Sequence, residues 1–287
     1  MNKFYLSILF FFFLAHTKAQ TPLTNYNFYN SFNNNPAMAG MDYKTQLTFT
    51  YGEQRNEQKG FLSYEASNEK LKSGMGFFVK SHRDRYRVTN HVGLAYNYTV
   101  HFSDLAKLTT GFQLSQVNLS AKPVDDSLKM REWWQAPNTD LGVVFSFEEL
   151  KIGASLFHVF RPGILFENDS LDFYIPQLYD NRGVNLSISY NGKVSEYLEF
   201  QIAFFHHLER GRYKRNRVID LSAFLTIYKY VTIGATYRSL ESSDDNLNKL
   251  YLGLRPTKKI LFNFSFNLKR PSSGVQYPME VLAQYQF

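Results

Sequence analysis

The residues best suited to catalysis or metal binding lack the spacing that either chemistry needs. His206 and His207 are adjacent, so in a strand their side chains point to opposite faces and cannot readily chelate one ion. The other histidines considered have no ligand-spaced neighbour in the sequence: His82, His91, His101 and His158. No nucleophile elbow, phosphate-binding loop or H-E-x-x-H motif occurs. We therefore predict no metal, no cofactor and no catalytic residue.

Pairs of acidic residues also fail to indicate an enzyme. Asp125 and Asp126, Glu148 and Glu149, and Asp244 and Asp245 are neighbours in sequence. A glycosidase needs two carboxylates that face each other across a substrate, and adjacent residues do not supply that arrangement. Turns commonly carry such charges, so a non-enzymatic protein is the expectation, and a hydrolase is a weaker hypothesis.

Two basic segments and one tryptophan pair are the candidates for binding a partner. The basic segments, 81–87 and 209–217, are predicted to be loops that meet lipopolysaccharide phosphates or an acidic protein. A solvated rim facing lipid head groups is the alternative reading of both. An exposed tryptophan pair is costly unless it packs in a loop cap or anchors a partner. The predicted contact residues are Arg83, Arg85, Arg87, Trp133, Trp134, Arg212, Lys214 and Arg215.

The beginning of the sequence is typical of a secretory signal peptide. Lys3 precedes an apolar run from Phe4 to Ala15, and Ala19 is a small residue at a plausible cleavage point. The run is too short to cross a bilayer as a helix. We predict that residues 1–19 are removed, which lowers the formal charge from +7 to +5 because Lys3 and Lys18 are lost. Nucleic acid fits this charge but not an exported protein.

Composition narrows the class further. The chain has no cysteine, which excludes disulfides and a lipid-anchored lipoprotein. Mean hydropathy is −0.34, yet aromatic residues make up 17% of the chain. A membrane barrel can combine these properties, since only alternate residues face lipid and aromatic girdles mark both interfaces.

From Thr45 onward the chain is a series of segments in which apolar and small or polar residues alternate. This period-two pattern predicts a strand with one lipid-facing and one lumen-facing side. About fourteen strands are expected, near residues 44–52, 60–67, 73–80, 88–102, 106–118, 138–147, 150–158, 183–193, 198–208, 217–227, 230–239, 249–255, 259–268 and 278–287. The fold class is therefore all-β, a transmembrane up-and-down antiparallel barrel over residues 44–287. Residues 20–43 are predicted to form an irregular segment, periplasmic or packed in the lumen.

The connections and the last strand orient this barrel. Short and long connections alternate, as in outer-membrane barrels with short periplasmic turns and longer extracellular loops. An even strand number then places both termini in the periplasm. In the last strand, Tyr285 and Phe287 fall on the apolar face. We expect them to face lipid in the periplasmic girdle and to mark the strand used in barrel assembly.

Residues 25–40, NYNFYNSFNNNPAMAG, resemble the N-terminal signature of the PorP/SprF family of outer-membrane proteins. The matching positions are Asn35, Pro36, Ala37, Ala39 and Gly40, with Met38 in place of the usual tyrosine. Further similarity follows in order at Gly93–Tyr98, Leu108–Phe112, Thr139–Val143, Ile152–Pro162 and Ile233–Arg238. Phe262–Lys269 departs from the family's usual strand at that point, which concerns the subfamily and not the barrel.

The resemblance implies a protein of the Bacteroidetes type IX secretion and gliding machinery in the outer membrane. It implies a non-enzymatic role with a secreted, adhesin-like cargo protein and other type IX components as partners, and it carries over no catalytic residue. We expect the barrel to help export or surface-anchor its cargo. The alternative is a FadL-like or porin-like channel for a small solute, gated by the N-terminal segment.

Overall fold

The structure is a computed structural model of the 287-residue chain. It describes residues 31–41, 45–54, 57–83, 87–121, 132–160, 182–210, 215–240, 247–268 and 279–287.

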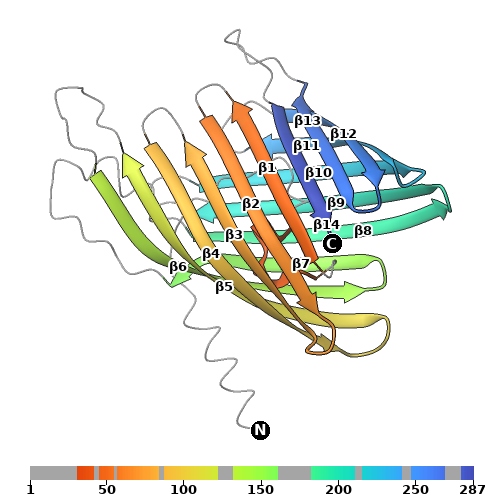
Figure 1. Cartoon of the computed structure of the whole chain (residues 1–287), viewed down its shortest axis with the longest axis horizontal. Helices are drawn as coiled ribbons and strands as arrows, with labels where there is room; N and C mark the ends of the chain where they lie inside the picture. The colour runs from red at the N-terminus through yellow and green to blue at the C-terminus, as the bar shows by residue number, and fades with distance from the viewer. Residues whose placement is uncertain are drawn as a thin grey trace.

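Fourteen strands form one closed barrel in which each strand pairs with its neighbours in sequence, and β1 pairs with β14 (Figure 1). All of these pairings are antiparallel. The predicted up-and-down barrel is therefore confirmed. The strands are β1 Thr45–Gln54, β2 Glu57–Asn68, β3 Ser73–Arg83, β4 Arg87–His101, β5 Ala106–Ala121, β6 Glu132–Phe147, β7 Leu150–Phe160, β8 Arg182–Ser195, β9 Leu198–Arg210, β10 Arg215–Ile227, β11 Val231–Leu240, β12 Leu247–Thr257, β13 Ile260–Asn267 and β14 Met279–Gln286.

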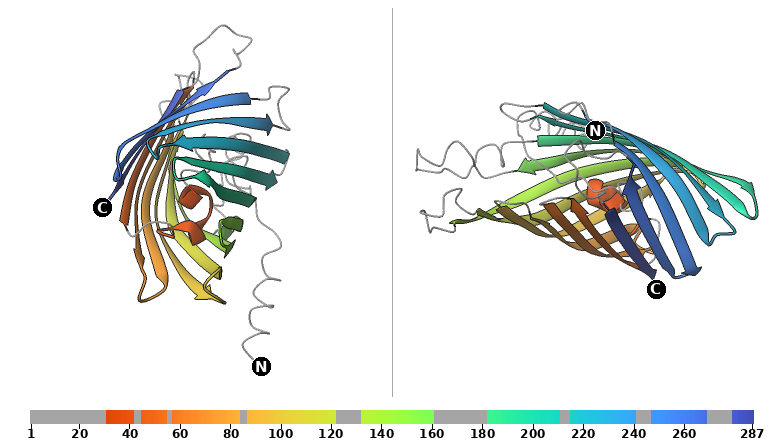
Figure 2. Two further views of the ribbon diagram at one scale, coloured as in Figure 1. Left: turned by 90° about the vertical axis from the view of Figure 1, so that its right-hand side faces the viewer. Right: turned by 90° about the horizontal axis from the view of Figure 1, so that it is seen from above.

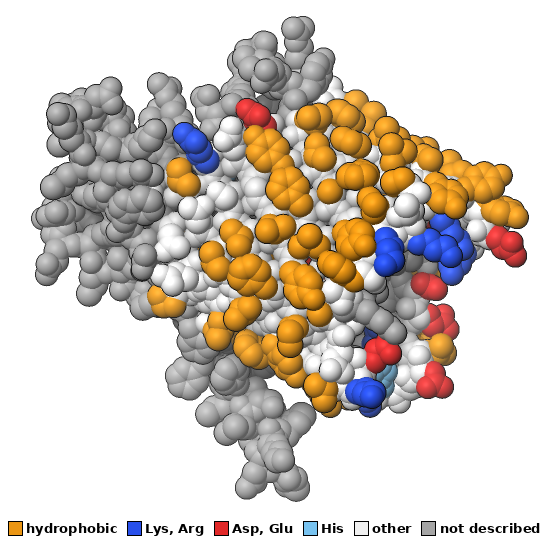
Figure 3. Space-filling model, viewed as in Figure 1, with side chains coloured by type: hydrophobic (Ala, Val, Ile, Leu, Met, Phe, Trp, Pro, Cys, Tyr) orange, Lys and Arg blue, Asp and Glu red, His pale blue; other side chains and the backbone are white. Residues whose placement is uncertain are grey.

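The alternation in the sequence becomes the two sides of the wall. On β1, Leu47 and Phe49 are exposed on the outside, whereas Gln46 and Thr48 are buried inside. Hydrophobic side chains accordingly cover much of the outer face in Figure 3, and charged side chains gather mainly toward one edge. This is the reverse of a water-soluble protein and suits a wall that faces hydrocarbon. Phe224, the exception to the pattern in β10, faces inward and packs against Tyr251 and Leu282.

Closure satisfies the backbone of the first and last strands. The β1–β14 ladder runs from the pair Gln46 and Gln286 to the pair Glu53 and Met279. An unpaired strand edge would cost several kcal/mol for each backbone group in a bilayer, so this seam removes a large penalty. Among the described residues, no helix has the length and apolarity to cross a membrane.

Several strands are longer than the sequence pattern indicates. Only residues 55–56, 84–86 and 211–214 separate β1 from β2, β3 from β4 and β9 from β10. The predicted loops 81–87 and 209–217 are therefore wrong at their ends, because β3, β4, β9 and β10 extend into both segments as far as Arg83, Arg87, Arg210 and Arg215. Ladder pairs such as Gln58 with Arg83, and Arg215 with Arg210, show why. Backbone pairing persists where the side chains have already become polar, and alternation does not reveal it.

Both the start of β1 and the end of β14 lie at the same end of the barrel, since the strand number is even. We call it the short-turn end, and its connections are residues 69–72, 102–105, 148–149, 196–197, 228–230 and 258–259. Figure 1 shows the C-terminus at this end. The assignment of this end to the periplasm stays a prediction.

Two short 3₁₀ helices lie inside the barrel, as both views of Figure 2 show. They are η1 Ser31–Asn34 and η2 Pro36–Met38. We call residues 31–41 the plug. The structure places them in the lumen, while the predicted boundaries 1–19, 20–43 and 44–287 remain predictions.

Candidate functional site

The plug takes its shape from Asn35 and Pro36. Asn35 is extended, with φ −156° and ψ 113°, and its side-chain oxygen accepts a hydrogen bond of 3.0 Å from the backbone nitrogen of Ala37. Asparagine is a favoured N-cap, and proline suits the first helical position because that backbone nitrogen has no helical partner anyway. The N-P-A sequence thus builds a capped turn of η2.

The same asparagine fastens the plug to the wall. Its Nδ2 donates hydrogen bonds of 3.2 Å to the carbonyl of Val143 in β6 and of 3.2 Å to the carbonyl of Ala154 in β7. A Cβ atom placed on Gly142 would collide with the Asn35 amide oxygen. A side chain on Gly142 would therefore interfere with the docking of Asn35.

Carbonyl groups of η1 are bound by polar side chains of the wall. The Asn34 carbonyl accepts hydrogen bonds from Ser155 Oγ at 2.6 Å and from Asn185 Nδ2 at 3.0 Å. The Asn33 carbonyl accepts one from Lys80 Nζ at 3.3 Å. These contacts satisfy backbone groups that a buried loop would otherwise leave costly.

Asn97 of β4 holds the C-terminal half of the plug. Its Nδ2 donates to the carbonyls of Ala37 at 3.0 Å and Ala39 at 2.6 Å, and its Oδ1 accepts from the backbone of Gly74 at 2.7 Å. Gly40, with φ +63°, then donates its backbone N–H to Glu65 Oε2 at 3.1 Å. Glycine adopts this left-handed conformation without the strain that a Cβ adds.

An aromatic contact completes the docking. The Phe32 ring packs edge-on against Phe61 at 6.5 Å and Phe78 at 5.8 Å, between ring centroids. Lys80 Nζ lies 4.7 Å from the Phe78 centroid. Because these residues are buried, the lumen contains a small hydrophobic core next to its hydrogen bonds.

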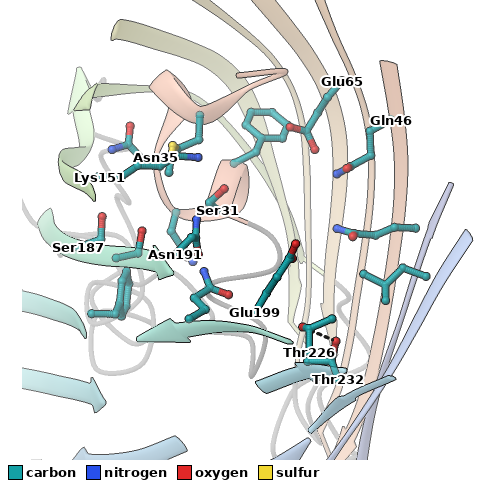
Figure 4. Close-up of a pocket in the computed structure, with 18 of the residues that line it drawn as sticks. Ser31, Asn35, Gln46, Glu65, Lys151, Ser187, Asn191, Glu199, Thr226 and Thr232 are labelled. Carbon is teal, nitrogen blue, oxygen red and sulfur yellow. Dashed lines mark hydrogen bonds between the residues drawn. The ribbon is translucent and has the colours of Figure 1, made fainter. Parts of the chain in front are cut away.

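A polar cavity of about 390 Å³ lies between the plug and the opposite wall. The hydrogen bonds described above all reach β2–β8, whereas the cavity is lined by the plug and by every strand from β7 through β14 to β1 and β2. Figure 4 shows Ser187 and Asn191 across this space from Gln46 and Glu65. Hydroxyl and amide groups dominate the lining, and its charged members are Glu65, Lys151, Glu199, Lys229 and Arg255.

Two further buried polar groups stiffen the wall. Arg238 Nε and Nη2 donate to the two carboxylate oxygens of Asp220 at 2.6 Å and 2.5 Å, which forms a bidentate salt bridge between β11 and β10. Asp140 accepts from Gln113 at 2.5 Å and from the backbone of His158 at 2.8 Å. His158 has φ 60°, beside the irregular register of β6 and β7, so Asp140 supports a strained stretch of backbone.

The structure brings together the predicted N-terminal motif: Asn35, Pro36, Ala37 and Gly40 are all buried in the lumen. Sequence reasoning did not identify their partners Asn97, Ser155 and Asn185. Each lies at an inward position of its strand, where a period-two pattern predicts a lumen-facing side chain but not its contact. The motif and these inward amides on other strands were the available signal.

The predicted partner-binding residues that the structure describes lie on four different strands. Arg83, Arg87 and Arg215 belong to β3, β4 and β10, and Trp133 and Trp134 to β6, so their assignment to loops is corrected. Arg85, Arg212 and Lys214 lie outside the described residues. At the other end of the barrel, Tyr285 and Phe287 are exposed on the outer face with ring centroids 4.9 Å apart.

The histidines acquire neighbours that the sequence does not show. The rings of His91 and His158 lie 6.4 Å apart, centroid to centroid. Across the described part of the chain, no three side chains of His, Asp or Glu gather as a metal site requires.

Comparisons with known proteins point to one family. The model for the type IX secretion system membrane protein PorP/SprF matches residues 16–284. A search of curated proteins found no match.

Three solved structures illustrate the similarity of fold. Acinetobacter baumannii Omp33 has a TM-score of 0.54 at 9% identity, covering 86% of this chain and 100% of the other. The Ralstonia pickettii toluene transporter TbuX has a TM-score of 0.51 at 9% identity, covering 88% and 92%. A Pseudomonas aeruginosa FadL homologue has a TM-score of 0.50 at 9% identity, covering 88% and 93%. At this identity the likeness is one of fold.

Proposed function

The chain belongs to the family of type IX secretion system membrane proteins PorP/SprF, and we propose that it is an accessory barrel that binds a specific secreted protein and helps to export it or hold it at the cell surface. The family and the fold place it in the outer membrane. The proposed role is non-catalytic, and its partners are an adhesin-like cargo and other type IX components.

The observation that carries this proposal is the occupied lumen. Residues 33, 34, 35, 37, 39 and 40 all hydrogen-bond to the wall around β2–β8. A barrel whose plug is hydrogen-bonded to the wall in this way is better suited to presenting its surfaces to other proteins than to passing solutes.

The proposed cargo surface lies at the end opposite the short turns, which we assign to the cell exterior. Arg83 and Arg87 end and begin strands there, and Trp133 and Trp134 lie near the start of β6. Aromatic and arginine side chains are the types that most often anchor protein partners. Lipopolysaccharide phosphates are the second ligand that the basic residues suit.

The test is recovery of the cargo. Affinity purification of the barrel from outer membranes is expected to recover a secreted protein with a type IX C-terminal signal, and deletion of the gene should stop its secretion or surface attachment. The double variant Trp133→Ala and Trp134→Ala should lower recovery, whereas Lys258→Ala, at the short-turn end, should not. No recovered cargo together with unchanged secretion in the deletion strain would contradict the proposal.

The alternative, a solute channel, is separated by conductance. Two of the similar structures are named as a transporter and a FadL homologue, which is the observation in favour of a channel. Purified barrel in planar bilayers is expected to show no steady conductance. A steady open pore in the intact protein would favour the channel.

A further inference from the structure

One row of side chains on β8 faces the lumen, and only its first member contacts the plug by a hydrogen bond. Asn185, Ser187, Ser189 and Asn191 alternate along the strand and point inward. Asn185 at one end donates to a backbone carbonyl of the plug, that of Asn34. The other three line the cavity, and within the described chain their side chains make no hydrogen bond.

The neighbouring strand continues the same surface. Gln201 of β9 is directly opposite Asn191 in the ladder and also lines the cavity. Although these four side chains face inward, all are half-exposed, since they border open space. Serine, asparagine and glutamine offer both donors and acceptors, which is what a peptide backbone needs from a binding surface.

The spacing of the row also fits a peptide. Alternate residues of a strand lie about 6.6 Å apart, and the peptide groups on one side of an extended polypeptide repeat at the same distance. Ser187, Ser189 and Asn191 can therefore each meet one group of an extended segment laid along β8. The hydrogen bond from Asn185 to the plug already shows this row binding a peptide carbonyl.

The cavity has cationic groups toward the short turns. Lys229 lies in the turn between β10 and β11, and Arg255 lies near the end of β12. Glu199 is also in the lining, so the field is mixed, but cations outnumber acids. A volume of about 390 Å³ falls within the range of ligand pockets and admits only a few residues of chain.

We propose that this cavity binds an extended segment of another polypeptide, which enters from the short-turn end, hydrogen-bonds to Ser187, Ser189, Asn191 and Gln201, and places an acidic group near Lys229 and Arg255. This site is separate from the cargo surface proposed above, and an experiment that contradicts one of the two proposals leaves the other untouched.

The experiment uses the full-length barrel in detergent and two pentapeptides of alternating serine and threonine, one with a free C-terminal carboxylate and one amidated. Titration calorimetry is expected to show binding of both peptides, with the carboxylate form tighter. The double variant Asn191→Ala and Gln201→Ala should weaken both at least tenfold. Arg255→Gln should weaken only the carboxylate form.

A matched control separates binding from folding. Ile202→Ala changes the residue next to Gln201 on the lipid-facing side and should leave both affinities unchanged. All variants should keep the faster gel mobility of an unheated, folded barrel. The proposal is overturned if the intact protein binds neither peptide, if the double variant binds as well as the parent, or if maltotriose binds in place of the peptides. Loss of cargo recovery in the previous test would leave these results unaffected.

Discussion

Asn35 joins three parts of the molecule with one side chain. Its oxygen caps η2, and its nitrogen binds carbonyls of β6 and β7. A short amide suits this place because the oxygen and nitrogen bonded to its Cγ atom offer an acceptor and two N–H donors. Neither aspartate nor serine offers the same set.

Replacement of Asn35 by alanine should loosen the plug. The cap contributes about 1 kcal/mol, and each lost wall hydrogen bond about another 1 kcal/mol, so we expect a loss of about 2–4 kcal/mol. Urea titration followed by tryptic digestion of the plug measures this loss. Asn191→Ala is the matched control, because Asn191 also faces the lumen but makes no side-chain hydrogen bond to the plug, and it should change stability by less than about 0.5 kcal/mol. Equal effects of the two changes would contradict the assigned role of Asn35.

Gly111 tests how closely the plug approaches the wall. A Cβ atom at this position would lie 2.5 Å from the backbone nitrogen of Ala37, so Gly111→Ala must displace backbone and not a flexible side chain. We expect faster proteolysis of the plug. Gly60→Ala is the control, since nothing lies within 4 Å of its Cβ position, and it should digest as the parent does. A plug equally protected in both variants would show that it does not rest on β5.

At the scale of single elements, the sequence predicted the strands and their two faces better than it predicted where each strand ends. Alternation along β4, from Val92 outward-facing to Asn97 inward-facing, was enough to predict the strand and its two sides, since burial follows period two. Strand ends were not predictable from it. The β4–β5 ladder continues to the pair Arg87 and Ala121, and backbone hydrogen bonds of this kind leave no mark on the pattern of side chains.

The docking of the plug was also beyond local reasoning. Residues 31–41 have no regular period, and their partners come from seven strands between β2 and β8. Asn35 and Ala154 are 119 positions apart in sequence, yet they share a hydrogen bond. Contacts of this kind depend on barrel closure, so the motif could be recognised from its residues but its wall partners could not.

Removal of residues 31–41 should leave the barrel folded and open its lumen. The strand ladders do not include the plug, so the barrel should keep its heat-sensitive gel mobility. Planar-bilayer recordings should then show a steady conductance that the intact protein lacks. A deletion variant that folds and still does not conduct would mean that other residues close the lumen.

At the scale of the whole molecule, the surroundings of an exposed side chain depend on its height in the bilayer. Leu94, in the middle of β4, is 62% exposed, and Leu105, in a short turn, is 54% exposed. We expect these similar exposed fractions to correspond to two different surroundings, hydrocarbon for Leu94 and the membrane interface for Leu105.

Replacing each leucine by a charged residue tests this difference in surroundings. Leu94→Arg should destabilise the barrel by about 2–4 kcal/mol, whereas Leu105→Arg should cost about 0–1 kcal/mol, because the penalty falls with distance from the bilayer centre. Guanidinium unfolding in lipid vesicles measures both. Similar small costs would mean that Leu94 does not face lipid.

The seam between β1 and β14 sets the order in which the molecule can be completed. These two strands are the most distant in sequence, yet they are neighbours in the wall. The first strand synthesised must therefore wait for the last, and the polypeptide that precedes it must already be within the curve of the sheet, or fold back through an open mouth, when the two margins join. A chain that has not yet closed is therefore a curved open sheet with the plug attached at its β1 edge, and the β1–β14 pairing cannot form until the last strand has been made.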